Sequence, residues 1–226
     1  MKTVGVIGLG DMGFAMAKNL IKGGFVACGY DPRAERRELL DGAGGTGLAS
    51  ARAVGERATA VFVMVLNGDQ AKAAILAEDG VAAGMARGGT VIVSATIKPA
   101  EVREIAAALA QRGLSVIDTP VSGGRAGAEA GTLTMMAAAP VAVLEAQMDV
   151  LKAVGENIHH VGEEIGMGQT VKGALQAVMG ATMASIYEAM VLGAKAGIPP
   201  DTLVRVFTTR SAGSRRMQGN MEAVAA

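Results

Sequence analysis

The sequence predicts an α/β protein with a doubly wound parallel sheet, followed by an all-helical segment. Three observations support this prediction. A glycine-rich turn joins an N-terminal strand to a helix, and apolar runs of strand length alternate with helical patterns as far as residue 162. In addition, the proline-free stretch Gly166–Ala196 has the pattern of one helix, which would span roughly 46 Å. Because a helix of this length usually joins two layers, we expect one domain over residues 1–162 and a second over residues 163–226.

The composition excludes several classes of protein. Half of the 226 residues are apolar, which argues against disorder, and 21 basic residues balance 21 acidic ones, which argues against a nucleic-acid or anionic-membrane partner. The single cysteine, Cys28, rules out an intrachain disulfide framework and suits a reducing cytoplasm. We expect no signal peptide, because the N-terminus runs directly into a strand pattern. We expect no membrane span either, because no run of about 18 uncharged apolar residues occurs.

The first strand, Thr3–Ile7, leads into a dinucleotide-binding fingerprint. The fingerprint consists of Gly8, Leu9, Gly10, Asp11, Met12 and Gly13, and a helical pattern continues through Leu20. In this context Gly8 permits a tight turn, Gly10 lets the backbone approach a pyrophosphate, and Gly13 lets the helix and strand pack closely. The helix N-terminus adds N–H donors and a partial positive charge. A merely glycine-rich turn is the alternative.

The second strand, Phe25–Tyr30, ends at an acidic residue that predicts the cofactor. Asp31 lies 18 residues after Gly13, close to the spacing of the carboxylate that binds an adenosine ribose. Such a carboxylate accepts hydrogen bonds from both ribose hydroxyls and repels a 2′-phosphate, so we expect NAD. Arg33 and Arg36-Arg37 leave NADP open, because arginine can pair with a 2′-phosphate. We interpret them as solvated residues of the next helix.

Later strands place further residues at one edge of the sheet. The run Ala60–Leu66 lacks alternation, as expected of a strand that is covered on both faces. Strands at Gly89–Val93 and Ser115–Asp118 follow, with a helix over Ala100–Arg112 and Gly113 as its C-cap. Ligands of such sheets bind outside the carboxyl ends of the strands. The predicted edge therefore carries the fingerprint, Asp31, Val65, Leu66 and Thr96.

The loop after Asp118 has four glycines before Leu133. Successive N–H groups at Ser122, Gly123 and Gly124 could form an anion-binding nest, although a tight connection alone would also explain the glycines. We expect strands at Leu133–Ala138 and Asn157–Val161, with a helix over Val141–Val154 between them. His159-His160 has no cysteine or carboxylate partner at metal spacing, so we predict no metal site.

The long helix carries one lysine at the start of a mostly apolar face. Lys172 and Gln176 lie one turn apart, and Met179 and Met183 continue their face. A buried lysine is costly unless it has a function, whereas a snorkelling lysine keeps its ammonium in water. After a break at Gly197–Asp201, we expect Asp201 to cap a helix over Thr202–Thr208. The tail Ser211–Ala226 has no clear partner.

These residues resemble the β-hydroxyacid dehydrogenases, a family that includes the 3-hydroxyisobutyrate dehydrogenases. Three motifs match in the family's order over essentially the whole chain: VIGLGDMG at Val6–Gly13 with MAKNL at Met16–Leu20, DTPVSGG at Asp118–Gly124, and GMGQTVK at Gly166–Lys172. The resemblance implies a Rossmann-like NAD-binding domain, then an all-helical domain similar to that of 6-phosphogluconate dehydrogenase. A long interdomain helix would join them.

The resemblance also implies roles for individual residues. Lys172 would be the catalytic general acid/base, Ser122, Gly123 and Gly124 would hold the substrate carboxylate, and Val65, Leu66, Gln70 and Thr96 would lie along the cofactor. Most members have asparagine where this chain has Gln176. The branch that acts on threonate is similar in carrying glutamine, so a four-carbon sugar acid is the expected substrate, ahead of a 3-hydroxyisobutyrate-like acid. Gln176 would hydrogen-bond Lys172 or a substrate hydroxyl.

The expected reaction moves a hydride between the nicotinamide and the hydroxyl carbon of a small hydroxy acid. Apolar surroundings and the positive charge of oxidised nicotinamide both disfavour an ammonium, which suits Lys172 as a base. Family members continue through several more helices, so the helical domain is expected to be incomplete or completed by a partner. Alternatives are a semialdehyde reductase, such as tartronate semialdehyde reductase, and a non-catalytic dinucleotide-binding protein. An exposed apolar helix face predicts a homo-oligomer, either a dimer or a tetramer.

Overall fold

The computed structural model describes residues 1–208, and the tail Ser211–Ala226 lies outside the described residues. The chain divides into two compact units, Met1–Lys172 and Gly173–Ala226. The first contains the sheet and its covering helices. The division falls within the long helix, after its first turns.

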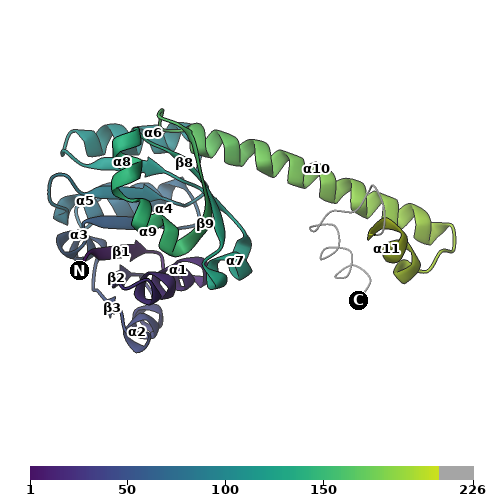
Figure 1. The fold of residues 1–226 in the computed structure, drawn as a ribbon, viewed down its shortest axis with the longest axis horizontal. Coiled ribbons are helices and arrows are strands. Elements are labelled where there is room, and N and C mark those ends of the chain that lie inside the picture. Colours follow the sequence, from purple (N-terminus) through teal and green to yellow (C-terminus); the bar gives the residue numbers. More distant parts are fainter. Residues whose placement is uncertain (209–226) are drawn as a thin grey trace. The chain divides into compact units, whose positions relative to one another are not determined.

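A nine-stranded sheet forms the first unit, with the order β3-β2-β1-β4-β5-β6-β8-β7 and β9 paired to β8 (Figure 1). The strands are β1 (Thr3–Ile7), β2 (Val26–Tyr30), β3 (Thr46–Gly47), β4 (Ala60–Val63), β5 (Thr90–Val93), β6 (Ser115–Asp118), β7 (Val121–Ser122), β8 (Leu133–Ala138) and β9 (Gly155–Gly162). The pairs from β3 through to β6 are all parallel. Strand β8 runs antiparallel to β6 and β7 but parallel to β9. The sheet is therefore mostly parallel, with the doubly wound order that the sequence predicts.

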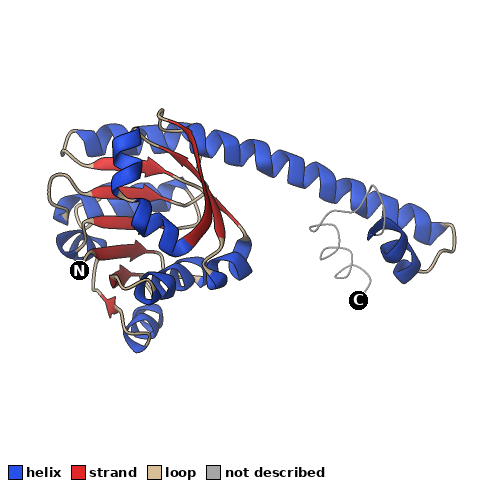
Figure 2. Ribbon diagram, viewed as in Figure 1, coloured by secondary structure: helices blue, strands red, loops and turns tan. Residues whose placement is uncertain are grey.

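Helices cover both faces of this sheet (Figure 2). They are α1 (Asp11–Lys22), α2 (Ala34–Gly42), α3 (Ala51–Arg57), α4 (Gly68–Leu76), α5 (Val81–Gly84), α6 (Pro99–Ala110), α7 (Gly124–Ala130), α8 (Val141–Ala146) and α9 (Met148–Val154). Strand β4 shows why the predicted run has no polar alternation. Ala60 and Phe62 enter one apolar core with α1 and α9, while Val61 and Val63 enter the other with α3 and α6. Both faces are buried, as in other parallel sheets.

Several predicted boundaries are wrong. The helix expected over Val141–Val154 is two helices that break at Gln147, where φ is −116°. The strand expected to reach Leu66 ends at Val63, and α6 ends at Ala110 with Gln111, rather than Gly113, as its C-cap. The last helix, α11 (Pro200–Thr208), includes Asp201 in its first turn rather than starting after it. Proline is favoured at this first helical position, because its missing N–H would have no partner inside the helix.

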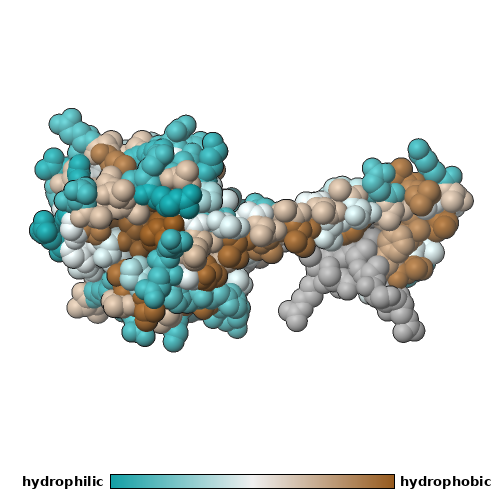
Figure 3. All heavy atoms as spheres, turned by 90° about the horizontal axis from the view of Figure 1, so that it is seen from above, coloured by the Kyte–Doolittle hydropathy of each residue, from teal (hydrophilic) through white to brown (hydrophobic). Residues whose placement is uncertain are grey.

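Within the described residues, the second unit contains the later part of α10 (Met167–Lys195) and α11. The bounds of α10 confirm the single long helix. Ile186 and Met190 pack with Leu203 of α11, but Val178 and Leu192 are 66% and 74% exposed. Apolar side chains gather on this surface (Figure 3). By length and apolar composition alone, α10 is a candidate membrane span, although Lys172 and Glu188 interrupt its apolar run. One such helix is weak evidence for a membrane protein, because core helices of soluble proteins can have the same length and composition.

Candidate active site

The glycine-rich turn is fastened to the carboxyl ends of two neighbouring strands. The Gly8 N–H donates to the carbonyl of Tyr30 at 2.9 Å, and the Leu9 N–H donates to Asp31 Oδ2 at 2.9 Å. Gly8 has φ +87°, and a Cβ there would strike the Met64 carbonyl after β4. A Cβ at Gly13 would overlap the Gly8 carbonyl oxygen, so α1 packs on the turn as closely as the fingerprint predicts.

The same turn leaves room for a phosphate group. Gly10 is the N-cap of α1 and supplies no side chain to the first N–H groups of the helix. A Cβ built on Gly10 meets no atom within 4 Å, so the protein itself does not require glycine here. Open space beside uncapped N–H donors fits the pyrophosphate of a dinucleotide. Met12 is half-buried against the core, whereas Asp11 is exposed and pairs with Arg36 at 3.4 Å and Arg125 at 3.6 Å.

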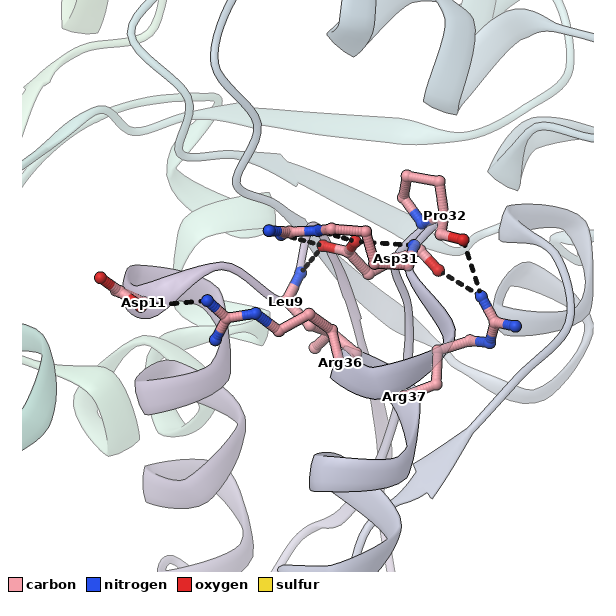
Figure 4. Close-up of polar contacts among 7 residues, drawn as sticks. Leu9, Asp11, Asp31, Pro32, Arg36 and Arg37 are labelled. Carbon is pink, nitrogen blue, oxygen red and sulfur yellow. Dashed lines mark hydrogen bonds and ion pairs between the residues drawn. The ribbon is translucent and has the colours of Figure 1, made fainter.

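Asp31 lies beside this turn and is only 4% exposed (Figure 4). Its Oδ1 accepts hydrogen bonds from the backbone N–H of Arg33 at 3.1 Å and from Arg33 Nε at 2.9 Å. Its Oδ2 accepts from the Leu9 N–H and from Arg33 Nη2 at 3.1 Å. Burial raises the pKa of this carboxyl, but the hydrogen bonds from Arg33 and Leu9 outweigh burial and hold the pKa below its usual value.

The contacts of Arg33 and Arg37 show that one prediction, which made them solvated residues of the next helix, is wrong. These arginines are not merely solvated residues of α2, because Arg33 pairs with Asp31 and Arg37 Nη1 donates to the Asp31 carbonyl at 2.6 Å. A carboxylate offers about four acceptor positions, and the four hydrogen bonds to Asp31 occupy that number. A ribose hydroxyl that binds Asp31 must therefore share an oxygen atom with, or displace, one of the donors of Arg33 or Leu9.

The other predicted cofactor residues follow the ends of β4 and β5. Val65 is half-buried, and Leu66 is 85% exposed. Gln70 Oε1 accepts from the Leu66 N–H at 3.0 Å, which closes the turn into α4. Thr96 is exposed two residues before Lys98, the N-cap of α6. Their contact with a cofactor stays a prediction.

A buried polar network fixes the start of α10 against the ends of β5 and β6. Asp118 is fully buried, and its Oδ2 accepts from the N–H groups of Gly166 at 2.9 Å and Gln169 at 3.3 Å. Gln169 Nε2 donates to Asp118 Oδ1 at 2.9 Å and to the Ala95 carbonyl at 3.0 Å, and Gln169 Oε1 accepts from the Ile97 N–H at 3.0 Å. Burial raises the pKa of Asp118 despite these hydrogen bonds.

Lys172 lies in the next turn of α10 and is buried, with 7% of its surface exposed. Its Nζ donates to the Val121 carbonyl at 2.8 Å, so the snorkelling alternative, with the ammonium in water, is wrong. Val121 directly precedes the predicted anion nest. Ser122 is half-buried, and Gly123 has φ +132°, a conformation that side chains disfavour. The lysine amine is thus joined to the loop that carries Ser122, Gly123 and Gly124.

Gln176 and the histidine pair are the remaining residues that the sequence analysis considered for a site. Gln176 is exposed and belongs to the second unit, so its role at the site stays a prediction. His160 Nε2 lies 2.9 Å from the Ala139 carbonyl. Within residues 1–208, no group of three His, Cys, Asp or Glu side chains is placed to hold a metal ion.

The sequence analysis did not recognise the parts played by Asp118, Gln169 and Asn19. Asp118 appears there only as the end of a strand and the first residue of a motif, and Gln169 only as part of another motif. Asn19 Nδ2 donates to the Ala128 carbonyl at 2.6 Å, which joins α1 to α7 and so connects the glycine-rich turn with the predicted nest. A polar residue within a mostly apolar segment of the sequence is the signal that could have indicated these residues.

Comparison with known proteins gives a consistent family assignment. Residues 3–162 match the NAD binding domain of 6-phosphogluconate dehydrogenase, and residues 166–226 match the NAD-binding segment of NADP-dependent 3-hydroxyisobutyrate dehydrogenase. An L-threonate dehydrogenase of Cupriavidus necator is 38% identical over 97% of this chain and 73% of its own. An NAD-dependent L-serine dehydrogenase of Pseudomonas aeruginosa is 36% identical over 95% of this chain and 72% of its own.

A solved structure agrees with this assignment. The 3-hydroxyisobutyrate dehydrogenase of Salmonella typhimurium superposes with a TM-score of 0.91 and 36% identity, over 100% of this chain and 79% of that one. The dinucleotide fingerprint, the buried lysine and the glycine loop beside it occur here on the fold of that enzyme. The chain therefore belongs to the β-hydroxyacid dehydrogenase family of NAD(P)-dependent oxidoreductases.

Proposed function

We propose that the protein oxidises a four-carbon sugar acid of the L-threonate type with NAD, using Lys172 as general base. The observation that supports this most directly is the buried Lys172 amine, which is 2.8 Å from the carbonyl of Val121 at the start of the Ser122–Gly124 loop. An amine held out of water beside a candidate carboxylate site is suited to proton transfer. Bound NAD supplies a nicotinamide that accepts hydride from the substrate carbon.

The chain's own residues would bind the substrate and move one proton. Backbone N–H groups at Ser122, Gly123 and Gly124 would bind the substrate carboxylate. As the hydroxyl carbon gives up hydride, the neutral Lys172 amine takes the hydroxyl proton, which leaves a carbonyl and an ammonium. In the reverse direction the ammonium returns this proton to the oxygen. Gln176 would hydrogen-bond a substrate hydroxyl or Lys172.

The cofactor site would use the glycine-rich turn and the strand ends around it. Gly8, Leu9, Gly10, Asp11, Met12 and Gly13 would bind the pyrophosphate, and Asp31 the adenosine ribose. Val65, Leu66, Gln70 and Thr96 would lie along the cofactor. We assign this NAD-binding domain to residues 1–162 and the helical domain to residues 163–226.

Two observations support the substrate class. Gln176 stands where most of the resembled family has asparagine, and the relative from Cupriavidus necator is named for L-threonate.

The absorbance of NADH at 340 nm distinguishes the candidates when the full chain is mixed with NAD and either L-threonate, L-serine or 3-hydroxyisobutyrate. We expect the highest kcat/KM with L-threonate. Reduction of tartronate semialdehyde by NADH without oxidation of any hydroxy acid would favour a semialdehyde reductase. Dinucleotide binding without turnover of any of the four compounds would favour a non-catalytic protein.

Lys172→Met tests the catalytic assignment. We expect kcat to fall by at least about 10²-fold, because a general acid–base group contributes about 10²–10⁴-fold. The Kd for NADH should stay within about twofold, since the glycine-rich turn is unchanged. Lys152→Met, at an exposed position of α9, is the matched control and should keep full turnover. Wild-type turnover in Lys172→Met would remove the assignment.

We propose that the protein is soluble and works in the cytoplasm, because its relatives are named as dehydrogenases of small hydroxy acids. Cys28 is a free, buried thiol, and burial raises its pKa to about 11. Such a thiol is poorly reactive, because the nucleophilic form is the thiolate.

We also propose that the protein is a homo-oligomer, either a dimer or a tetramer. The exposed apolar side chains of α10 support this proposal.

A further inference from the structure

We propose that Asp118 and Gln169 form a positioning pair that sets where the Lys172 amine lies. This inference rests on the proposed function, because it assigns a purpose to the buried network in terms of the proposed general base. All of its contacts lie within the first compact unit, Met1–Lys172. Neither residue is assigned a contact with substrate or cofactor, so both would act through Lys172.

The first step concerns how α10 begins. The opening N–H groups of a helix lack partners within the helix. Here the Asp118 carboxylate, from the end of β6, accepts from the Gly166 N–H at 2.9 Å and the Gln169 N–H at 3.3 Å. A Cβ at Gly168 would strike the carbonyls of Met136 and Asp118, so the helix lies directly on the backbone of β8 and β6. Asp118 thus caps a helix that begins about 50 residues later in the sequence.

The second step concerns the Gln169 side chain. Its amide group makes three hydrogen bonds, with the Ala95 carbonyl, the Ile97 N–H and Asp118 Oδ1, at 2.9–3.0 Å. These partners follow β5 or end β6, so one side chain joins two adjacent strand ends to the helix. Gln169 is only 3% exposed, so water cannot readily replace its hydrogen bonds.

The third step connects the pair to the amine. Lys172 lies three residues after Gln169, on the same side of the helix, and Val121 lies three residues after Asp118. The helix and the segment Asp118–Val121 are thus joined twice, by the contacts between Gln169 and Asp118 and by the 2.8 Å bond from Lys172 Nζ to the Val121 carbonyl. Loss of the first contact frees the helix to shift relative to the loop and moves the amine. A misplacement of about 1 Å can cost about 10²-fold in rate.

Gln169→Met tests the proposal because it keeps the side-chain length and removes all three hydrogen bonds. Gln147→Met is the matched control. Gln147 is a second buried glutamine, 8% exposed, and its Nε2 bonds Thr90 Oγ1 at 3.2 Å at the opposite end of β5. Both variants are expected to lose stability, so kinetics are measured well below each melting temperature. Only Gln169→Met should lose kcat, by about 10-fold to 10²-fold, with the Kd for NADH within about twofold of wild type.

Two further measurements distinguish positioning from a general loss of packing. Adding Gln169→Met to Lys172→Met should lower kcat no further, because a positioning residue has no effect once its target is gone. Hydrogen exchange of the amides in residues 166–172 should accelerate in Gln169→Met and stay as in wild type in Gln147→Met.

The outcomes separate this inference from the proposed function. The positioning role is wrong if Gln169→Met keeps kcat within twofold of wild type while Lys172→Met loses turnover. It is also wrong if the two losses are fully additive. Wild-type turnover in Lys172→Met removes the general base and, with it, this role for the pair. Unchanged exchange of residues 166–172 in Gln169→Met overturns the anchoring of α10 itself, whichever residue proves catalytic.

Discussion

Asp31 holds local structure together and is also the residue that we propose to bind the adenosine ribose of the cofactor. Its hydrogen bond from the Leu9 N–H holds the glycine-rich turn against the end of β2, and Arg33 supplies its other three donors. The carboxylate would also accept from the ribose hydroxyls of NAD. These two duties compete for the same oxygen atoms, so Arg33 is expected to influence how tightly the cofactor binds.

Cofactor preference tests this competition. Wild type should have a higher kcat/KM with NAD than with NADP, because the Asp31 carboxylate repels a 2′-phosphate. Asp31→Ser should lower the ratio of kcat/KM with NAD to kcat/KM with NADP, since it removes the negative charge and leaves Arg33 available to a phosphate. Arg33→Ala should raise the ratio, because it frees acceptor positions and removes the cation that a phosphate would use. Steady-state kinetics with both cofactors measure the effect, and a preference of wild type for NADP would contradict this role of Asp31.

The same hydrogen bonds predict a pH dependence of stability. The folded-state pKa of Asp31 lies below its usual value of about 3.9, so folding favours the ionised carboxylate. This contribution to the free energy of unfolding is fully present above about pH 4 and is lost as pH falls through the folded-state pKa.

Asp31→Asn should therefore be less stable than wild type at pH 7, and the difference should shrink below about pH 4. Urea unfolding at several pH values between 7 and 3 measures this difference. Arg33→Ala should reproduce part of the effect, because it removes two of the donors. A difference that stays constant down to pH 3 would contradict the proposed contribution of ionisation.

At the scale of the element, the turn between β1 and α1 contains one glycine that the packing of the protein requires and another that we propose the cofactor requires. A Cβ at Gly13 would overlap a backbone carbonyl, whereas a Cβ at Gly10 would face open space. Gly13→Ala should therefore destabilise the protein by about 1–3 kcal/mol, the usual cost of overpacking. Gly10→Ala should leave the melting temperature nearly unchanged and weaken NADH binding, because the added methyl group occupies the space proposed for the pyrophosphate.

Thermal unfolding and fluorescence titration with NADH measure the two effects, and each variant is the control for the other. Unaltered NADH affinity in Gly10→Ala would show that the pyrophosphate does not approach this part of the turn. Wild-type stability in Gly13→Ala would show that the close packing of α1 on β1 is not required.

The elements that local patterns define were predictable, while those fixed by distant contacts were not. Strand β1 and strand β6 have the predicted bounds, because apolar runs flanked by glycine or polar residues mark buried strands clearly. The break at Gln147 was missed because its side chain bonds Thr90, which is 57 residues earlier in the chain. Contacts between distant residues also explain why only part of the candidate site could be predicted. Lys172 could be found from its place in a motif, but the contacts of Asp118 with Gln169 depend on how β6 and α10 meet.

At the scale of the whole molecule, the described contacts gather the candidate site at one edge of the sheet. The glycine-rich turn follows β1, Asp31 follows β2, and Asp118 ends β6. These strands are parallel, so their carboxyl ends lie at the same edge of the sheet, with β4 and β5 between β1 and β6. The second unit contributes a different property, which is exposed apolar surface. Leu192 and Val178 are mostly exposed, and Val191 is 51% exposed. Exposed apolar side chains in this number are typical of an interaction surface, and we propose that a second copy of this chain covers it.

This surface predicts that the full chain self-associates through α10 and that a charge placed there opposes association. Val178→Glu combined with Leu192→Glu should lower the average mass in sedimentation velocity, because burial of two carboxylates at an apolar contact is costly. Val141→Glu, at an exposed apolar position at the start of α8, is the matched control and should sediment like wild type. The Kd for NADH should be equal in all three proteins, since no substitution touches the glycine-rich turn. A wild-type chain that sediments as a monomer at about 50 μM, well above the Kd of about 1 μM expected of a moderate complex, would contradict this prediction. Equal masses for the double variant and wild type would instead place the contact elsewhere on the chain.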